Sequence, residues 1–423
     1  MGQGRSATKG ASMEGLSQKQ KGATFGIYVV ILSVYFVIPD MGYISPSLSA
    51  IASTYGVDAG TASYLATIVA LMQVAGALVC GVVAGRRVRH KTLLSVAVAG
   101  MAVFGMIPGL FTPDVPFVVL MADRAVFGFF LGFLQPIIFA YIAHLFIDAN
   151  RRASAYGWGN VAFNAGAVFA SSVGGICVGI GWNAAFWLYG IGLIVLVCVL
   201  LFFEEPERVV GEGEAGGKTK ILPIAWFFMS VFLIAQVLDY PFFTAFIDSL
   251  IGHGITDGVV GGQLLSLFTL VGMFASAAFG RLFRGMHANV LPFACLVAGL
   301  GMTLIYVGIS QASSLALCIV AVCVVGFGHT LVTVSVPQCV SISCSASTAS
   351  AALAFTAVFM NVGVFVSSPY MQLVARMAHT TDYTIVFLVS GVAMAVLSLV
   401  TFLVLKARKP LVIEGEDAGA LLG

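Results

Sequence analysis

Residues 24–50 have the sequence TFGIYVVILSVYFVIPDMGYISPSLSA, an apolar run in which Asp40 is the one charged residue. The run at residues 221–251, ILPIAWFFMSVFLIAQVLDYPFFTAFIDSLI, contains Asp239 and, near its end, Asp248. About 20 apolar residues are enough for a helix to cross the hydrocarbon core of a bilayer. A carboxylate at that depth is costly, so we interpret Asp40 and Asp239 as functional, most simply as sites for a proton or a cation.

Ten further apolar runs extend the pattern, and together the runs predict an all-α membrane protein with 12 transmembrane helices. The chain has 423 residues, 60% of them hydrophobic and 9% charged, and its mean hydropathy is +1.03, which leaves too few charges to cover a soluble surface. Each run predicts a helix because hydrocarbon offers no hydrogen-bond partner for an open backbone, and the runs are too long and uniformly apolar for a β-barrel. The predicted helices span residues 24–50, 61–84, 92–112, 116–146, 153–179, 183–203, 221–251, 260–283, 289–309, 313–338, 347–374 and 383–406.

Basic residues are segregated to one side of the predicted membrane. All 20 Lys and Arg residues except Arg124 and Arg376 fall in the terminal segments or in alternate loops, which the positive-inside rule assigns to the cytoplasm. We therefore predict a multi-pass membrane protein with both termini cytoplasmic. Few charges and short outer loops favour a bacterial inner (plasma) membrane. A cleavable signal peptide is not expected, because residues 1–21 are polar and basic and the first apolar run is too long.

One long polar stretch divides the chain. Residues 204–220 are rich in Glu and Gly, which predicts a flexible cytoplasmic linker. The expected organisation is a cytoplasmic tail at 1–21, an N-terminal six-helix bundle at 22–203, the linker at 204–220, a C-terminal six-helix bundle at 221–406 and a cytoplasmic tail at 407–423.

The two halves resemble each other in sequence, in pairs of positions that share nearly the same offset. The pairs are Asp40 with Asp239 and Gly81 with Gly280 at 199 residues, Asn164-Ala-Gly166 with Asn361-Val-Gly363 at 197, and Val126-Phe-Gly128-Phe with Val324-Val-Gly326-Phe at 198. This common register predicts that the two bundles are pseudo-symmetric. Such an arrangement is typical of a transporter whose site lies between its halves.

The loop after the second predicted helix resembles a family signature. Gly81-Val-Val-Ala-Gly-Arg86-Arg-Val-Arg89-His-Lys is similar to Gly-x-x-x-Asp-Arg-x-Gly-Arg-Arg/Lys, which the major facilitator superfamily has at this place. The resemblance implies that Gly81, Arg86 and Arg89 serve the conformational change. The family's Asp belongs to a cytoplasmic charge network that latches the outward-facing state, and this chain has Gly85 in its place.

Two further segments resemble signatures of the same family. Arg124-Ala-Val-Phe-Gly128 in the fourth helix resembles Arg-x-x-x-Gly, whose Arg the family uses in proton coupling. In the fifth helix, Gly166 to Gly175 resembles the antiporter signature Gly-x-x-x-Gly-Pro-x-x-Gly-Gly, with Ala170-Ser171 in place of Gly-Pro. The resemblance covers residues 24–406. It implies a 12-helix transporter of the drug or metabolite:proton antiporter branch, with helices 1, 4, 7 and 10 around a central cavity.

Asp40 and Arg124 are predicted to form the proton-coupling pair. With a rise of 1.5 Å per residue, Asp40 lies about 24 Å above the cytoplasmic start of its helix and Arg124 about 12 Å below the outer start of the fourth. These depths nearly match the roughly 40 Å of core and interfaces, so the two side chains can be level. Burial favours the neutral acid and a neighbouring Arg favours the carboxylate, so a change in the cavity can load and release a proton.

Side chains on helices 1, 4, 7 and 10 are predicted to form the substrate cavity. They are Tyr43, Gln135, Gln236, Asp239, Phe243, His329 and Thr333. Val322 occupies the position equivalent to Arg124, so Asp239 has no predicted cationic partner and is assigned to substrate contact. With one base at depth and an otherwise aromatic and polar lining, the cavity suits lipophilic, neutral or cationic molecules better than anions.

Glycine and proline positions predict how the helices pack and bend. Pro39 and Pro241 flank the two acids and are expected to bend their helices there. Close helix packing is the expected role of Gly128, Gly132, Gly166, Gly174, Gly175 and Gly363.

The predicted function is secondary transport by alternating access, and the preferred form is proton-coupled efflux of a lipophilic, neutral or cationic compound. Two alternatives stay open: proton-coupled uptake of a polar nutrient, and a transporter-like receptor that does not transport. The sequence contains neither Gly-x-x-x-x-Gly-Lys-Ser/Thr nor a metal-ligand cluster, so no enzyme activity, cofactor or metal is expected. The expected partners are a small-molecule substrate, protons or sodium ions and the lipid bilayer, with no nucleic acid, and the expected state is a monomer.

Overall fold

The computed structural model of the protein describes residues 25–44, 47–57, 59–84, 87–205, 221–256, 258–344, 346–380 and 382–407. The predicted tail at 1–21, most of the predicted linker at 204–220, the chain beyond Ala407 and Arg86 lie outside the described residues. The described part is helical, apart from short connections and one isolated β-bridge between Ala84 and Val88.

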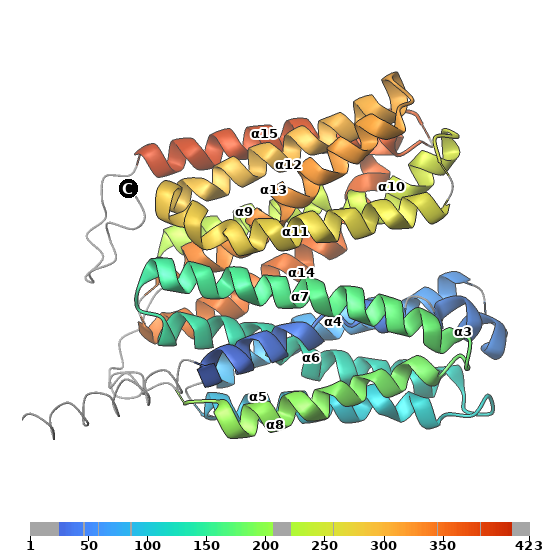
Figure 1. Ribbon diagram of the computed structural model, residues 1–423, viewed down its shortest axis with the longest axis vertical. Helices are drawn as coiled ribbons and strands as arrows, with labels where there is room; N and C mark the ends of the chain where they lie inside the picture. The colour runs from blue at the N-terminus through green and yellow to red at the C-terminus, as the bar shows by residue number, and fades with distance from the viewer. Residues whose placement is uncertain are drawn as a thin grey trace, which may run out of the picture.

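The first half of the chain forms helices that fill the lower part of Figure 1. They are the helix Phe25–Val37, α2 (Met41–Ile44), α3 (Leu48–Tyr55), α4 (Ala59–Val83), α5 (His90–Met106) with η2 (Ile107–Leu110), α6 (Phe117–Leu145), α7 (Ala149–Val178), η3 (Ala184–Gly190) and α8 (Ile191–Phe202). Apart from the division of the predicted helix 24–50, the predicted boundaries agree with these to about one helical turn.

The second half fills the upper part of Figure 1. Its elements are α9 (Pro223–Asp239), α10 (Pro241–Gly252), α11 (Gly258–Met286), η4 (His287–Asn289), α12 (Val290–Tyr306), η5 (Val307–Gln311), α13 (Leu315–Ile342), α14 (Ala346–Met377) and α15 (Thr384–Ala407). The long helices of both halves run side by side across the figure, in the arrangement expected of segments that cross a bilayer together.

Most of these helices are long and apolar enough to cross a membrane. Nine candidate spans occur within the described residues, and one of them, Val260–Gln311, is a 52-residue segment that includes α12 and most of α11. Two shorter apolar helices, Phe25–Val37 and Ile68–Val83, accompany them. Large apolar side chains such as Phe274 and Leu201 are exposed along the helices, as expected where lipid surrounds them. The predicted all-α class is confirmed.

Both helices that contain a buried acid are interrupted at that acid. The helix Phe25–Val37 ends before Pro39, and α2 begins directly after Asp40. In the second half, α9 ends at Asp239 and α10 begins at Pro241. Proline has no backbone N–H and its ring clashes with the preceding turn, which explains both interruptions. The predicted bends are confirmed, and the single helices predicted at 24–50 and 221–251 are each divided.

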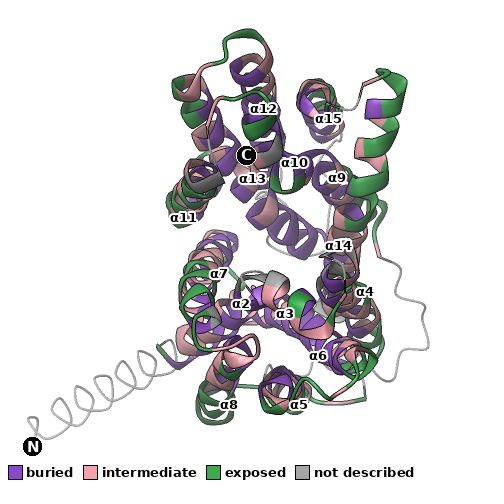
Figure 2. Cartoon of the chain, turned by 90° about the vertical axis from the view of Figure 1, so that its right-hand side faces the viewer, coloured by how far each residue is buried: buried purple, intermediate pink, exposed green. Residues whose placement is uncertain are grey.

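Polar contacts between the halves lie toward one end of the molecule, where α7 and α14 begin and α11 and α13 end. Ser276 Oγ donates to Asn160 Oδ1 at 2.9 Å, and Gln338 Nε2 donates to the Ala149 carbonyl oxygen at 2.8 Å. We call this the basic end, because the exposed bases Arg87, Arg89, Arg151, Arg281 and Arg284 lie there. It is at the left of Figure 1, and Figure 2 views the molecule from the opposite end.

Glycines permit the closest helix contacts, and these contacts repeat between the halves. A Cβ at Gly166 of α7 would collide with the Phe36 carbonyl oxygen, and one at Gly363 of α14 would lie 2.6 Å from the Leu233 carbonyl oxygen of α9. Gly363 follows Gly166 by 197 residues, and Leu233 follows Phe36 by the same 197. Hence α7 packs on the Asp40 helix in the way that α14 packs on the Asp239 helix.

The same repetition holds for a second helix pair. A Cβ at Gly128 of α6 would lie 2.6 Å from the Val69 carbonyl oxygen of α4, and one at Gly326 of α13 would lie 2.8 Å from the Phe268 carbonyl oxygen of α11. Gly132 approaches the Gln73 carbonyl oxygen in the same manner. These contacts are the close packing that the sequence predicts for Gly128 and Gly132.

The remaining predicted packing positions differ from one another. A Cβ at Gly81 of α4 would lie 3.0 Å from Ala354 Cβ of α14, so this glycine lies where the halves meet, and Gly174 is buried. Gly175 is exposed, and a Cβ there would meet nothing within 4 Å among the described residues. The close-packing role predicted for Gly175 is therefore wrong. Arg89 is exposed at the start of α5.

Candidate functional site

Asp40 and Arg124 form a buried ion pair between the first helix and α6. Arg124 Nη2 lies 3.4 Å from Asp40 Oδ2. Arg124 is 0% exposed and Asp40 is 6% exposed. The contact that the depth estimate predicts is therefore present. Two opposite charges withdrawn from solvent stabilise each other only while both remain, since removal of one leaves the other buried and uncompensated.

Tyr189 of η3 joins this pair as a third polar group. Its hydroxyl donates to the Asp40 carbonyl oxygen at 3.2 Å and accepts from Arg124 Nη2 at 3.4 Å. The guanidinium carbon lies 3.9 Å from the centre of the Phe127 ring, a cation–π contact. Arg124 Nε and Nη1 have no hydrogen-bond partner among the described residues. The sequence analysis did not predict Tyr189 as a site residue. The one feature that could have indicated it is a polar hydroxyl in the apolar run at 183–203.

Tyr43, predicted for the substrate cavity, packs beside the same pair. Its ring centre lies 4.8 Å from that of Tyr189, and Tyr43 is buried. Phe127 also contacts Tyr189, at 4.8 Å between ring centres. Aromatic rings therefore line the Asp40–Arg124 pair and exclude water from it.

The second acid also has a partner. Asp239 Oδ2 of α9 lies 3.3 Å from His329 Nδ1 of α13. Asp239 is 2% exposed, and its Oδ1 has no hydrogen-bond partner among the described residues. Sequence comparison by offset did not predict this partner, whose imidazole is a cation only when it is protonated. Val322 does hold the position equivalent to Arg124, but His329 follows it by seven residues, two turns along the same face of α13.

Aromatic rings surround His329. Its ring centre lies 5.4 Å from that of Phe243 and 5.6 Å from that of Phe268. The side chain of His329 is 15% exposed and Phe243 is 38% exposed. Of the residues predicted for the cavity, Asp239, Phe243 and His329 therefore form one cluster, open on the side of the imidazole and Phe243.

Two other residues predicted for the cavity lie in packed surroundings. Gln236 is buried, and a Cβ at Gly363 of α14 would lie 2.8 Å from Gln236 Cβ. Thr333 is half-buried and its hydroxyl donates to the Thr330 carbonyl oxygen at 2.8 Å.

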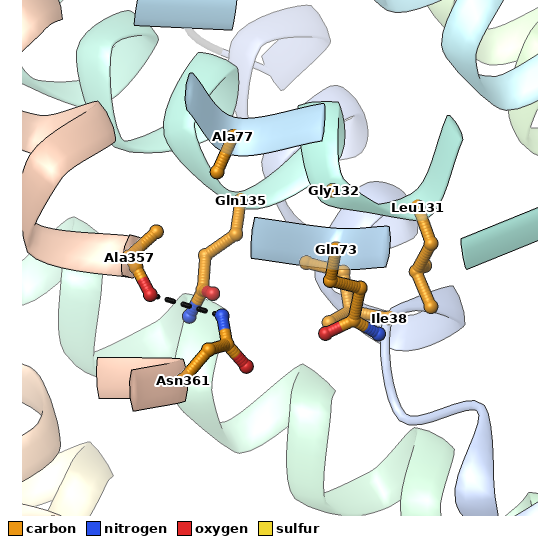
Figure 3. A pocket seen from close by; sticks show the side chains of 8 residues that line it. All are labelled: Ile38, Gln73, Ala77, Leu131, Gly132, Gln135, Ala357 and Asn361. Atoms are coloured by element: carbon orange, nitrogen blue, oxygen red, sulfur yellow. Dashed lines mark hydrogen bonds between the residues drawn. The ribbon is translucent and has the colours of Figure 1, made fainter. Parts of the chain in front are cut away.

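A small pocket lies between the halves, beside the interruption at Asp40. Helix α14 of the second half closes one side of it (Figure 3). Its lining is uncharged and consists of Ile38, Gln73, Ala77, Leu131, Gly132, Gln135, Ala357 and Asn361. Gln135 is the one lining residue that the sequence predicts for the cavity, and its side chain and that of Asn361 point toward each other in Figure 3.

The pocket is rich in side-chain amides, which both donate and accept hydrogen bonds. Asn361 Nδ2 donates to the Ala357 carbonyl oxygen at 2.9 Å, and Gln135 Nε2 lies 3.7 Å from Met360 Sδ. Sequence reasoning missed Gln73, and it used Asn361 only as a marker of the repeat. Within the part of the chain that the structure describes, no group of three or more His, Cys, Asp or Glu side chains could hold a metal ion.

Comparison of the sequence with models of known protein families identifies a family of membrane transporters, in agreement with the helical fold described above. The sequence model of the Major Facilitator Superfamily matches residues 30–368. The chain belongs to the major facilitator superfamily. Membership, together with the apolar helices, makes it a multi-pass membrane protein and a secondary transporter of a small molecule rather than an enzyme.

Solved structures of transporters have a similar fold. The human organic anion transporter MFSD10 is 14% identical, with a TM-score of 0.71 over 90% of this chain and 99% of that one. The proton:xylose symporter XylE is 13% identical, with a TM-score of 0.72 over 90% of this chain and 96% of that one. The transporter FucP in its outward conformation is 11% identical, with a TM-score of 0.68 over 90% of this chain and 99% of that one. No curated protein sequence matches this superfamily member significantly.

Proposed function

We propose that this superfamily member is a proton-coupled secondary transporter in which Asp40 binds and releases the coupling proton. The observation that carries the proposal is the buried Asp40–Arg124 pair at an interrupted helix. A carboxylate withdrawn from water is stable as an anion only while a cation compensates it, and as a neutral acid without one. Separation of the pair would therefore load a proton, and its re-formation would expel one.

The surroundings of the pair fit such a cycle. Tyr189 holds both the Asp40 backbone and Arg124, so a shift of η3 or of the first helix alters the distance between the two charges. Asp40 lies in the gap between two helical pieces, which can rotate relative to each other more easily than a continuous helix. Alternating access would thus change the protonation of Asp40 through a small movement. Protons are the proposed coupling ion, with sodium as the alternative.

The proposed architecture is 12 membrane-crossing segments in two six-segment halves, 22–203 and 221–406, joined by a cytoplasmic linker at 204–220. The glycine contacts that recur at the same 197-residue offset support it. The exposed bases at the basic end support a cytoplasmic placement of that end, and of the tails at 1–21 and 407–423, in a bacterial inner membrane. The contacts between the halves there support a conformation closed to the cytoplasm. The proposed state is a monomer.

The proposed substrate is a lipophilic, neutral or cationic compound, and the proposed direction is export in exchange for protons. The rings around His329 support a lipophilic or cationic ligand, because aromatic faces attract cations and apolar groups. The Arg124 guanidinium pairs with Asp40, so its charge is less available to an organic anion than that of an unpaired arginine would be. The proposed contact residues are Tyr43, Gln135, Gln236, Asp239, Phe243, His329 and Thr333.

A second candidate function is proton-coupled uptake of a neutral polar nutrient. The amides of Gln73, Gln135 and Asn361 in the pocket between the halves favour it, because amides pair well with hydroxyl groups. The similarity to a proton:xylose symporter adds weight at the level of the fold.

Transport in proteoliposomes separates the candidates. Vesicles with an imposed pH gradient are tested with ethidium as a lipophilic cation and with a labelled sugar and nucleoside as neutral solutes. Movement of ethidium against the proton flow supports export by exchange, and movement of a neutral solute with the protons supports uptake. The absence of gradient-driven movement and of counterflow for every compound contradicts both and favours a receptor.

The Asp40→Asn variant tests the role of the acid in the same vesicles. We expect loss of gradient-driven movement and retention of counterflow, because the site still binds and reorients but no longer takes up a proton. Asp114→Asn, at an exposed acid in the connection before α6, is the matched control and should behave as the wild type. Gradient-driven movement at the wild-type rate in Asp40→Asn would refute the assignment.

A further inference from the structure

The second carboxylate differs from the first in the chemistry of its partner. Asp40 faces an arginine, which is charged at every pH that the protein meets, so the Asp40–Arg124 pair is neutral without any added proton. Asp239 faces His329, 3.3 Å away, and an imidazole is charged only when it has bound a proton. The two pairs have related positions in the halves but unequal proton contents.

The burial of Asp239 means that the protonation of its partner decides whether the pair is neutral. Asp239 is 2% exposed, and Oδ1 has no hydrogen-bond partner among the described residues. An uncompensated charge in such surroundings is strongly unfavourable. The neutral forms of the pair are a carboxylate with an imidazolium, or a carboxylic acid with a neutral imidazole. Each of these forms contains one dissociable proton, held on the line between Asp239 Oδ2 and His329 Nδ1.

Few other ionisable groups face this pair. The elements packed against α9 are α10, α12, α13, α14 and α15, and α11 adds Phe268 beside the imidazole. The buried Cys295 thiol of α12 lies within electrostatic range of Asp239, and the Tyr240 hydroxyl lies within that of Asp40. The Asp248 side chain is outside the description.

The other ionisable side chains near by are distant from the pair or engaged elsewhere. Tyr370 of α14 pairs with Ser390 of α15, and Arg376 and Lys406 are exposed in the last turns of those two helices. On the helices packed against α13, the remaining charged groups lie at the basic end or beside Asp40: His144, Arg151, Arg152, Arg281, Arg284, Asp123 and Arg124. No permanent cation among the described side chains therefore replaces the proton of the pair.

We propose that Asp239 and His329 form a second proton-binding site, in which the two side chains share one proton and His329 passes it between Asp239 and the exposed side of the cluster. The partial exposure of His329 and the exposure of Phe243 put the imidazole on the open side, with the carboxylate behind it. A proton arriving at Nε2 gives an imidazolium, whose Nδ1–H then donates to Asp239 Oδ2. Release follows the reverse order, and one proton enters or leaves in each direction.

The proposal deepens the proposed function and rests on it in one respect, namely that protons are the coupling ion. Without its proton the pair carries one negative charge beside the rings of Phe243 and Phe268. A monovalent cation on those rings would neutralise that charge, so one proton and one cationic substrate compete for the same place. The site is thereby suited to the exchange of a proton for a lipophilic cation.

Spectroscopy on the full-length protein tests the shared proton without any substrate. Infrared absorption detects the C=O stretch of a protonated carboxyl, and nitrogen NMR of 15N-histidine-labelled protein distinguishes neutral from charged rings. In His329→Gln the remaining Asp239 should take up the proton, so a protonated-carboxyl band should appear and should be absent from His329→Gln/Asp239→Asn. In Asp239→Asn the His329 ring should be neutral at neutral pH. His379→Gln, at an exposed histidine, is the control. Its carboxyl absorption and the signals of its other histidine rings should be those of the wild type.

Two results in the variants would overturn the proposal: no carboxyl band in His329→Gln, or a charged His329 ring in Asp239→Asn. A third is measured in wild-type protein labelled at both aspartate and histidine, where independent titration of the Asp239 and His329 signals would also overturn it. The last measurement needs no variant and so stands even if a variant fails to fold. Asp40→Asn should leave the Asp239 and His329 signals as in the wild type.

Flux measurements keep this proposal distinct from the proposed function. Both acids must bind and release a proton for ethidium to be driven by the pH gradient. Gradient-driven ethidium movement should therefore be lost in Asp239→Asn as in Asp40→Asn. If the spectroscopic results hold while the wild type moves no compound with the pH gradient, the proposed function fails and the proton site stands. If Asp40→Asn behaves as expected while the spectroscopic signatures are missing, the proposed function stands and the second site fails.

Discussion

At the scale of single residues, the protein contains two carboxylates whose neighbours compensate them in different ways. Arg124 pairs with Asp40 and has a fixed positive charge. Its guanidinium contacts the Tyr189 hydroxyl and the face of the Phe127 ring. His329 lies beside Asp239 with a charge that depends on a proton. In the cycle that we propose, the first pair responds to a change in distance and the second to a change in proton supply. Conformational and chemical steps of that cycle therefore belong to separate side chains.

Tyr189→Phe tests whether the hydroxyl positions the first pair. The substitution keeps the ring contact with Tyr43 but leaves the Asp40 carbonyl oxygen and one Arg124 donor without their partner. A buried polar group left unpaired costs about 1–3 kcal/mol, so the thermal midpoint of unfolding in detergent should fall. Tyr64→Phe, at an exposed tyrosine of α4, is the control and should leave the midpoint unchanged. Equal midpoints for both variants would show that the hydroxyl has no structural part.

The sequence predicts some of these residue contacts but not others, for identifiable reasons. A charge in an apolar run is conspicuous, so Asp40, Asp239 and Arg124 stand out, and the depth estimate pairs the first with the third. Tyr189, Gln73 and Asn361 are neutral polar residues in helices, where nothing distinguishes them from ordinary packing. His329 stands out singly, but its partner is missed because the comparison by offset considers one position of α13 and not the same face two turns on.

At the scale of elements, the prolines and glycines determine where helices break and where they touch. Pro39 and Pro241 interrupt the two acid-bearing helices, as their lack of an N–H predicts. Gly166 and Gly363 let α7 and α14 approach the backbone carbonyls of those helices. Gly175 follows the same sequence pattern and touches nothing among the described residues, because a signature does not reveal which face of a helix is covered.

Single-methyl substitutions test the repeated contacts. In Gly166→Ala and Gly363→Ala the new Cβ would press on the Phe36 and Leu233 carbonyl oxygens, and such overpacking costs about 1–3 kcal/mol. Both variants should have lower thermal midpoints, with Gly166→Ala the more affected because its contact is the closer. Gly175→Ala, at the open position, is the matched control and should unfold as the wild type does. A stable Gly166→Ala would mean that α7 and the first helix are less closely packed than described.

Gly157→Ala tests the closure of the basic end. A Cβ at Gly157 of α7 would collide with the Ser276 carbonyl oxygen of α11, in the other half. We expect the halves to separate there, which would lengthen the distance between spin labels introduced as unnatural amino acids at Arg151 and Arg284. Gly262→Ala, on α11 where a Cβ meets nothing within 4 Å, is the control. A distance distribution unchanged from the wild type in Gly157→Ala would contradict the role of this contact.

At the scale of the whole molecule, two groups of helices meet at the basic end and enclose an uncharged pocket between them. The sequence predicts the helices from their apolar runs and the two halves from the common offset. It does not predict the pocket, because that depends on which amides of α4, α6 and α14 come together when the halves close. In the cycle that we propose, this closure alternates between the two ends while the buried pairs exchange protons.

The most direct test of Asp40 as the coupling acid is the proton flux that accompanies ethidium movement. It is followed with a pH-sensitive dye trapped in proteoliposomes of the wild type and of Asp40→Asn. In the wild type we expect a proton flux opposite to the ethidium flux and proportional to it. In Asp40→Asn we expect ethidium counterflow without proton movement. A proton flux in Asp40→Asn equal to that of the wild type would contradict this role of Asp40.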